Sequence, residues 1–480
     1  MRRPRAEERE RQDARSKSDG SARARKKHSQ AYSRHEAEEA AATAAVAAAA
    51  AAGAMGEEEE AVQFGSKTPY AEPAWYNSKN ESALYNENHV AFRAKMRKFV
   101  DEEVIPNVSE WEANGIPKEA YKKAAQVGLL PTVLGWPEDC VSQPRPEGMD
   151  GLMLLIAMDE LCRCASGGVV WGLVGAAGIG LPPLVHYASD EIKERVVKPV
   201  LDGEKFAALA VSEAGAGSDV ANLATTAEED GDDYVINGLK KWITGGMFAD
   251  YFTVAARTGG EGSGMFGISL ILVEKDRPGV SVRAMDCMGV KGSGTAFVEF
   301  DDVRVPKSNY VADVTALIRN FTTERLGIAV QANRFARECL RMSIEWTRRR
   351  QAFGKPLIDN PVVRNKLAEM ARQVEATHAY IESVAFRIVS QERRGDDWFQ
   401  GLLTLSPDAA MVKVQATKTY AHCASQAAML HGGNSYVRGG QHGRVESLYR
   451  DVLSLAIPGG AEDVMIDYAA RLGIAKKSPL

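Results

Sequence analysis

The sequence predicts an α+β protein of three consecutive domains: a helical domain, a small β-domain and a C-terminal helical domain. Hydrophobic residues recur every three to four positions between residues 79 and 204, the period falls towards two between 205 and 314, and helical spacing returns from 315 to 480. The 480 residues are 45% hydrophobic and 26% charged, which is typical of a globular protein large enough for several domains.

Residues 1–78 precede this pattern and differ in composition. Residues 1–35 contain nine Arg and three Lys against five acidic residues, and residues 36–60 are mostly Ala and Glu. Few of these side chains are branched, apolar or aromatic, so their burial cannot offset the entropy lost on ordering. We expect a disordered extension or a solvated Ala-rich helix, and Met55 is an alternative first residue.

Amphipathic segments predict the first helical domain, at Glu119–Gly128, Gly151–Cys164 and Asp190–Val200. The run from Gly167 to Ala188 carries no Asp, Glu, Lys or Arg and is long enough for a membrane span. Its glycines and the pair Pro182-Pro183 instead favour helices packed inside the protein. The sequence therefore predicts no membrane span.

The middle of the chain predicts a small β-barrel or sandwich, because short strand-like segments alternate with glycine-containing turns. The six candidate strands are Ala207–Ser212, Tyr234–Ile236, Tyr251–Arg257, Ile268–Glu274, Val280–Ala284 and Ala296–Phe300. Three long helical segments follow, at Ala316–Gln351, Pro361–Glu392 and Ser406–His431, and they predict a C-terminal four-helix bundle.

Charge and cysteine content exclude several classes of protein. The 59 Lys and Arg against 64 Asp and Glu give a net charge of −5, which argues against a surface built for nucleic acid. Six cysteines are too few for a disulfide scaffold in so long a chain and indicate a reducing compartment. The one close pair, Cys162 and Cys164, has no second pair at zinc-site spacing, so no metal site is expected.

Three motifs lie near the junctions of the predicted domains. Val211–Asp219 (VSEAGAGSD) combines small residues with hydroxyls, which suits a loop whose amides approach a ligand, although such turns are more often structural. Asn237–Gly246 places Trp242 and Thr244 two residues apart, on one face of a strand. Arg350–Gly354 (RQAFG) ends a long helix, where its charge also has a simple explanation in the helix dipole.

In this order the motifs resemble those of the acyl-CoA dehydrogenase family. Val211–Asp219 is similar to the family's TEPxAGSD motif, and Lys241–Thr244 to its KxWIT motif. Arg350–Leu357 matches RxxFGxPL. His431–Tyr436 resembles the GGxGY segment, and Tyr449–Asp451 contains the RD pair. The resemblance covers residues 80 to 475.

The resemblance implies a homotetramer or homodimer that binds FAD at a subunit interface and acts on an acyl-CoA. The residues that it assigns to FAD are Leu209, Val211, Ser212, Gly217, Ser218, Trp242, Ile243, Thr244, Ala461 and Asp463, together with Arg350, Phe353, Gly432 and Gly433, which would reach the FAD of a neighbouring subunit. For the acyl-CoA it assigns Ser218, Arg325 and Gly459.

The catalytic base is where the sequence departs most from the family. Removing a proton α to a thioester requires a carboxylate beside that carbon, and in much of the family a Glu near the C-terminus provides it. Alignment on Gly460-Ala461 places Gly459 at that position. Other members carry the base in an earlier helix, in a Glu-Arg pair, and Glu324 matches it. Glu462 is the rival, and the backbone N–H of Gly459 remains available to the thioester carbonyl.

Three further substitutions fall in the family motifs. Ala214 replaces a proline, Pro361 stands where many members have a cofactor-facing Gln, and Met429 stands where a Gln usually precedes the glycine pair. Asn360 before Pro361 is a good N-cap, so we expect the helix to be kept and one polar contact to FAD to be lost.

The resemblance implies FAD-dependent dehydrogenation of an acyl-CoA to a trans-2-enoyl-CoA, with an electron-transfer flavoprotein as acceptor. The alternatives are an acyl-CoA oxidase that uses oxygen, and a flavin-binding relative without this activity. Small residues between Val169 and Leu184 favour a long or branched acyl group. The family's role favours the mitochondrial matrix over the peroxisome, although acidic residues near the start are unusual for a transit peptide.

Overall fold

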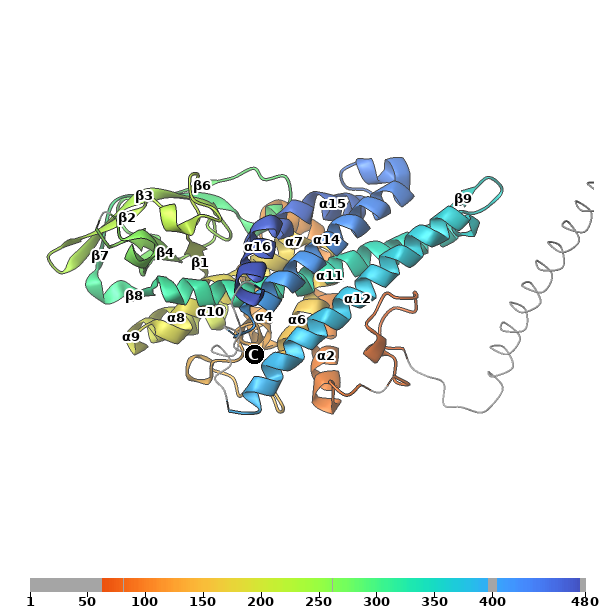
Figure 1. Cartoon of the computed structure of the whole chain (residues 1–480), viewed down its shortest axis with the longest axis horizontal. Helices are drawn as coiled ribbons and strands as arrows, with labels where there is room; N and C mark the ends of the chain where they lie inside the picture. The colour runs from red at the N-terminus through yellow and green to blue at the C-terminus, as the bar shows by residue number, and fades with distance from the viewer. Residues whose placement is uncertain (1–62, 81, 261, 396–403, 475–480) are drawn as a thin grey trace, which may run out of the picture. The chain divides into compact units, whose positions relative to one another are not determined.

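The computed structural model describes residues 63–474, apart from 81, 261 and 396–403 (Figure 1). The first domain is helical, as predicted. Its helices are α2 (Glu87–Phe99), α3 (Val108–Asn114), α4 (Lys118–Gln126), α5 (Leu129–Thr132), α6 (Gly151–Cys162), α7 (Gly167–Gly175), α8 (Pro182–Tyr187), α9 (Asp190–Ile192) and α10 (Lys198–Leu201). Every residue of α6 after Gly151 is buried, which makes this helix the centre of the domain.

The apolar run forms one nearly continuous helical stretch, Gly167–Tyr187, in which a π-helical turn (Ala176–Gly180) separates α7 from α8. Among the described residues it is the one helical stretch that has the length and hydropathy of a membrane span. Most of it is buried between other elements, which is typical of a core helix. This agrees with the packing expected from its glycine and proline residues.

The middle domain is a twisted, mostly antiparallel sheet. The strands are β1 (Ala207–Ala210), β2 (Thr226–Asp230), β3 (Asp233–Ile243), β4 (Tyr251–Arg257), β5 (Ile268–Glu274), β6 (Val280–Ala284), β7 (Ala296–Pro306) and β8 (Tyr310–Asp313). They pair in the order β6-β7-β3-β2-β4-β5-β8, and β1 lies parallel to β4. Within the described residues the two ends of this path, β6 and β8, do not pair, so the sheet is not a closed barrel.

All six predicted strands are present, and β4, β5 and β6 have the predicted bounds. The sequence did not indicate β2 or β8. Three of the five residues of β2 are exposed and acidic, so β2 lacks the apolar alternation of a typical strand. It forms because its backbone pairs with β3 along the whole length of β2.

The C-terminal domain contains three long helices, α11 (Val314–Arg349), α12 (Pro361–Glu392) and α14 (Ser406–His431), with α15 (Gly443–Ala456) and α16 (Glu462–Gly473) packed on α14. In Figure 1 α11 and α12 run side by side and meet at the hairpin of β9 (Gln351–Ala352) and β10 (Lys355–Pro356). The start of α12 is as predicted, because the side chain of Asn360 accepts a hydrogen bond from the Val362 N–H at 2.9 Å.

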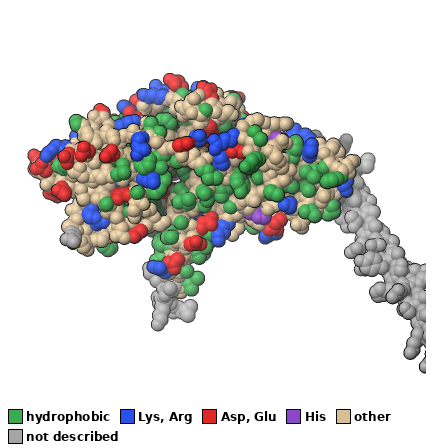
Figure 2. Space-filling model, turned by 90° about the horizontal axis from the view of Figure 1, so that it is seen from above, with side chains coloured by type: hydrophobic (Ala, Val, Ile, Leu, Met, Phe, Trp, Pro, Cys, Tyr) green, Lys and Arg blue, Asp and Glu red, His purple; other side chains and the backbone are tan. Residues whose placement is uncertain are grey.

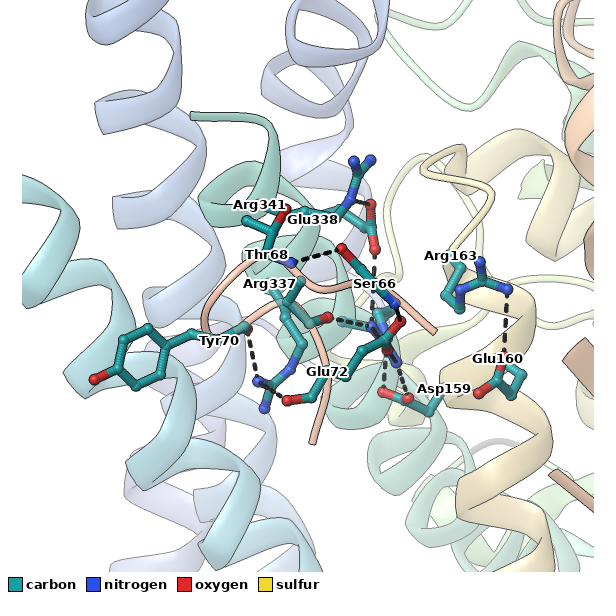
Figure 3. Close-up of polar contacts among 12 residues, drawn as sticks. Ser66, Thr68, Tyr70, Glu72, Asp159, Glu160, Arg163, Arg337, Glu338 and Arg341 are labelled. Atoms are coloured by element: carbon teal, nitrogen blue, oxygen red, sulfur yellow. Dashed lines mark hydrogen bonds and ion pairs between the residues drawn. The ribbon is translucent and has the colours of Figure 1, made fainter. Parts of the chain in front are cut away.

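The predicted boundary of the N-terminal extension is too late in the chain. Residues 1–62 lie outside the described residues, but 63–78 pack against the helices, and Ala71, Glu72 and Tyr76 are buried. Figure 3 shows Glu72 among basic side chains. Its carboxylate accepts hydrogen bonds from Arg97 (2.9 and 3.1 Å) and from Arg334 (3.2 Å).

These contacts explain the difference from the sequence-based expectation. Burial alone would raise the pKa of Glu72, but Arg334 and Arg97 lower it to about 2, so the carboxylate stays charged inside the fold. Arg337 also donates to the carbonyl oxygen of Tyr70 at 2.9 Å (Figure 3). Arg97, Arg334 and Arg337 lie on α2 and α11, far from this segment in sequence, so its local composition does not reveal these contacts.

Candidate active site

A cavity of about 1030 Å³ lies where the three domains meet. The helical domain contributes α6 and α7, the β-domain contributes the ends of β1 and β3 and the loop after β6, and the C-terminal domain contributes α11 and the segment between α15 and α16. Of the residues singled out from the sequence, eleven line it: Leu209, Val211, Ser212, Gly217, Ser218, Trp242, Ile243, Thr244, Glu324, Arg325 and Gly459. Tertiary folding thus brings together motifs more than 200 residues apart.

The β-domain wall consists of the Val211–Ser218 loop and the end of β3. Trp242 and Thr244 both line the cavity, but not by the regular alternation that the sequence suggested. The register of β3 shifts between Lys240 and Ile243, and Trp242 has φ +62°. At this bulge the Trp242 side chain is 47% exposed, and the Lys241 ammonium lies 4.4 Å from the ring centroid.

A buried ion pair that the sequence analysis missed fixes this wall. Lys240 is fully buried, and its Nζ donates to Glu213 Oε1 at 2.7 Å and to the carbonyl oxygen of Val211 at 3.0 Å. Glu213 also accepts from the N–H groups of Ala224 and Thr225. Lys240 and Glu213 both lie inside motifs that the sequence singled out. The opposite charges of these two residues were the signal that could have predicted the ion pair.

Glu324 lines the cavity from α11. Its side chain is partly buried, and within the described residues its carboxyl group has no hydrogen-bond partner. Burial raises its pKa to about 7, although the nearby charges of Arg325 and Lys413 act in the opposite direction. A carboxyl group in this environment exchanges a proton near neutral pH, which suits a general base.

The turn before α16 faces Glu324. Arg325 donates from Nε to the carbonyl oxygen of Gly459 at 2.8 Å, and Lys413 donates from Nζ to the carbonyl oxygens of Ala456 (2.6 Å) and Gly460 (2.8 Å). Gly459 has φ +66°, and a Cβ there would lie 3.0 Å from Cδ1 of Ile328 on α11. The turn is therefore fixed from two helices, and position 459 lies directly over the α11 turn that carries Glu324.

Glu462, the rival carboxylate, is turned away from this space. It lies in the first turn of α16 and accepts a hydrogen bond from Thr417 Oγ1 of α14 at 2.6 Å. It is not among the residues that line the cavity. Ala461 and Asp463, which the resemblance assigned to FAD, lie at the same helix start and are likewise outside the cavity lining.

The four residues assigned to a neighbouring subunit's FAD lie outside the cavity as well. Arg350 ends α11, and Phe353 lies at the tip of the β9–β10 hairpin with 97% of its surface exposed. Gly432 and Gly433 follow α14, close to the end of α11, because Trp346 donates to the carbonyl oxygen of Leu430 at 3.2 Å.

Large apolar side chains are also exposed near this end and along α15 and α16. They are Met429, Tyr436, Val437, Tyr449, Leu453, Val464 and Ile466. Figure 2 shows hydrophobic side chains gathered in a band across the face seen from above. Exposed apolar surface of this kind is typical of a protein–protein interface.

Asp451 joins the three domains beside the cavity. Its buried carboxylate on α15 accepts from the N–H of Gly167 at the start of α7 (3.0 Å) and from the N–H of Val290 after β6 (2.9 Å). Burial, with Glu112 nearby, raises its pKa to about 6. One side chain thus connects the walls of the cavity that come from different domains.

Family models cover most of the chain. Those of the N-terminal, middle and C-terminal domains of acyl-CoA dehydrogenase match residues 86–204, 208–303 and 314–473. The chain belongs to the acyl-CoA dehydrogenase family. Members of this family are flavoprotein oxidoreductases, so the chain is an oxidoreductase with FAD as its cofactor.

Individual relatives agree with this assignment. The acyl-CoA dehydrogenase AFT10-1 of Alternaria alternata is 36% identical over 415 residues, 84% of this chain and 95% of the relative. The solved acyl-CoA dehydrogenase of Geobacillus kaustophilus is 29% identical, with a TM-score of 0.72 over 82% of this chain and 99% of that one. An acyl-CoA dehydrogenase of Bacillus anthracis, solved with FAD, shares the fold at 24% identity and a TM-score of 0.73, covering 81% of this chain and 68% of that one.

The β-domain wall of this acyl-CoA dehydrogenase fits a flavin. No atom lies within 4 Å of the position that a Cβ would take at Gly215 or Gly217, so packing inside the protein does not require these glycines. Their backbone is open to a ligand. The half-exposed indole of Trp242 offers a flat apolar surface in the cavity that Gly217 and Thr244 also line.

Proposed function

We propose that this acyl-CoA dehydrogenase removes the α-proton and the β-hydrogen of an acyl-CoA thioester and releases a trans-2-enoyl-CoA, with Glu324 as the base. The observation that carries the proposal is the position of Glu324, the one acidic side chain on the α11 face of a cavity built from all three domains. FAD, when bound, supplies the acceptor for the β-hydride.

The chemistry of Glu324 supports this role. A general base works best when its pKa lies near the working pH, and burial raises the pKa of Glu324 to about 7. Without a competing hydrogen bond, its carboxylate is free to accept the α-proton. Glu462 is committed to Thr417 and is a weaker candidate.

The Gly459 turn supplies the second requirement, which is stabilisation of negative charge on the thioester oxygen. Within the described residues the Gly459 N–H has no acceptor, and Lys413 and Arg325 fix the turn through its carbonyl groups. A fixed N–H donor at the oxygen of a developing enolate lowers the barrier to proton removal. Arg325 and Ser218 complete the proposed acyl-CoA contacts.

The residues proposed to hold FAD fall into two groups. The isoalloxazine contacts are Leu209–Ser212, Gly217, Ser218 and Trp242–Thr244. Arg350, Phe353, Gly432 and Gly433 bind the FAD of a second subunit in a homodimer or homotetramer, where the Arg350 guanidinium pairs with a pyrophosphate. Their exposure at the end of α11 and α14 supports this, because exposed residues are accessible to a second subunit.

The proposed substrate carries a long or branched acyl group. Gly175 and Gly178 of the Gly-rich stretch line the cavity, and no atom lies within 4 Å of a Cβ position at Gly178. Activity that peaks with butyryl-CoA and vanishes with palmitoyl-CoA would contradict this preference.

The electron acceptor that we propose is an electron-transfer flavoprotein, and the proposed location is the mitochondrial matrix, with the peroxisome as alternative. Both follow from the usual role of the family. Oxygen consumption during turnover would instead indicate an oxidase, and cell fractionation tests the location.

Anaerobic titration of the purified yellow protein with acyl-CoAs of different chain length tests the proposed reaction. We expect bleaching of the flavin absorbance and formation of a trans-2-enoyl-CoA. If no acyl-CoA bleaches a fully flavinated protein, the chain is a flavin-binding relative without this activity.

A further inference from the structure

A polar pair lies deep in the apolar part of the cavity. Gln331 lines the cavity seven residues after Glu324 on α11. Seven residues are almost two helical turns, so the two side chains project from one face of the helix, about 10 Å apart along its axis. Opposite Gln331, Trp171 of α7 lines the cavity and donates from Nε1 to Gln331 Oε1 at 3.0 Å.

The indole fixes the orientation of the Gln331 amide. An indole N–H can only donate, so it must face the amide oxygen, and the NH₂ group must point elsewhere. Gln331 is 2% exposed, and within the described residues its Nε2 has no hydrogen-bond partner. A buried donor without an acceptor is costly, so a ligand that supplies the acceptor gains affinity.

We propose that Gln331 Nε2 binds an oxygen on the acyl chain of the substrate, so that the preferred substrate is an acyl-CoA with a hydroxyl, ketone or ether oxygen far from the thioester. This inference rests on the proposed function and names its substrate class. Each carbon advances an extended chain by about 1.25 Å, so a 10 Å separation places the oxygen roughly six to eight carbons beyond the α-carbon.

The surroundings of Gln331 favour a neutral oxygen over a carboxylate. The nearby lining of α6 and α7 is apolar and includes Leu154, Met158 and Val174. The basic residues of the cavity lining are Arg325, which binds the Gly459 carbonyl, and Arg450, which pairs with Glu446. A carboxylate beside Gln331 would be buried without a cation, at high cost.

Glycines line the cavity between Glu324 and Gln331. Gly327 lies between the two polar residues on the same cavity wall, and no atom lies within 4 Å of the position of a Cβ there. Gly178 on the opposite wall is equally free of contacts. A side chain at either position would narrow the passage that the acyl chain takes.

The test compares decanoyl-CoA with 10-hydroxydecanoyl-CoA and 5-hydroxydecanoyl-CoA in anaerobic flavin reduction. For the unchanged enzyme we expect kcat/KM to be about 5- to 30-fold higher for the 10-hydroxy compound than for decanoyl-CoA, the range for one hydrogen bond to an otherwise unpaired donor. The 5-hydroxy compound, whose oxygen falls short of Gln331, should show no such gain. Gln331→Leu should reverse the preference towards decanoyl-CoA.

Two further measurements keep the inference falsifiable. Dissociation constants measured with Glu324→Gln, in which flavin reduction is slow enough to observe binding first, should show the same preference. Trp171→Phe, which frees the amide to rotate, should weaken it. If the unchanged enzyme reduces its flavin with decanoyl-CoA as well as or better than with the 10-hydroxy compound, water satisfies the amide and the inference is wrong. If no acyl-CoA reduces the flavin, the proposed function itself fails.

Discussion

The guanidinium of Arg325 donates a hydrogen bond to the carbonyl oxygen of Gly459 at 2.8 Å and so joins α11 to the turn before α16. The neighbour of Arg325 is Glu324, which we propose as the base, and Gly459 is the position to which the sequence resemblance assigned the base of many family members. Positions 324 and 459, the two alternatives for the catalytic carboxylate, therefore line the same cavity. We therefore propose that the catalytic Glu of this chain lies on α11 and not in the turn before α16.

Replacing Glu324 tests whether it is the catalytic base. Glu324→Gln keeps the size of the side chain but cannot accept a proton. FAD content should be unchanged, while flavin reduction by acyl-CoA should slow by about 10²- to 10⁴-fold, the usual effect of losing a general base. Stopped-flow absorbance measures the rate. Glu462→Gln is the matched control and should stay within a few-fold of the unchanged enzyme. Equal losses in both variants would refute the assignment.

The raised pKa of Glu324 predicts the pH dependence of the reaction. Only the ionised carboxylate is a base, so kcat/KM for flavin reduction should rise tenfold per pH unit below about pH 7 and level off above it. A profile that is flat between pH 5.5 and 8.5 would show that a group with another pKa limits the reaction.

The same pKa predicts a change in stability. The folded protein holds the proton of Glu324 up to about pH 7, whereas the unfolded chain releases it near 4.5. The free energy of unfolding therefore falls as pH rises through this window, by up to about 3 kcal/mol. Denaturant unfolding at pH 5 and pH 8 should show a smaller fall for Glu324→Gln. An identical fall in both proteins would mean that Glu324 is not buried in the folded state.

Lys413 should tune the base and hold the Gly459 turn. Lys413→Met removes a positive charge that lowers the pKa of Glu324, so the pH profile of flavin reduction should shift to higher pH. The exposed Lys418 on the same helix provides the control Lys418→Met, which should leave the profile in place. Slower flavin reduction without a shift of its pH profile would mean that Lys413 only stabilises the Gly459 turn.

Arg350 should couple FAD binding to assembly. Arg348, Arg349 and Arg350 repel one another at the end of α11, and a pyrophosphate would compensate Arg350. Arg350→Ala should lower the flavin content and loosen the oligomer together, as measured by absorbance and light scattering. Arg372→Ala, a change at an exposed residue of α12, should alter neither. Full flavin occupancy in an unchanged oligomer would contradict the assignment.

Glu72 should stabilise the fold far more than a surface carboxylate. Glu72→Ala leaves Arg97 and Arg334 buried with one partner fewer, which typically costs about 3–5 kcal/mol in the free energy of unfolding. Glu369→Ala removes an exposed partner of Arg372 and should cost far less. Chemical denaturation measures both, and similar values would show that residues 63–78 add little to stability.

The sequence by itself determined the order of the domains, most helices and strands, the family motifs and Glu324 as the candidate base. The domain order, the helices and the strands follow from local hydrophobic periodicity. The motifs and Glu324 are recognised within short segments of the sequence. It assigned residues 63–78 to the extension because the partners of Glu72 are remote in sequence, and it missed β2 because that strand lacks apolar alternation.

Only the tertiary structure decided which candidate residues share one space. It put Glu324, Gly459 and Trp242 around a single cavity, turned Glu462 towards Thr417, and left the Arg350 end of α11 outside it. It also paired Lys240 with Glu213 and Trp171 with Gln331. Burial, the pKa of a carboxyl group and the partner of an amide depend on neighbours from other segments, so they are fixed only when the chain has folded.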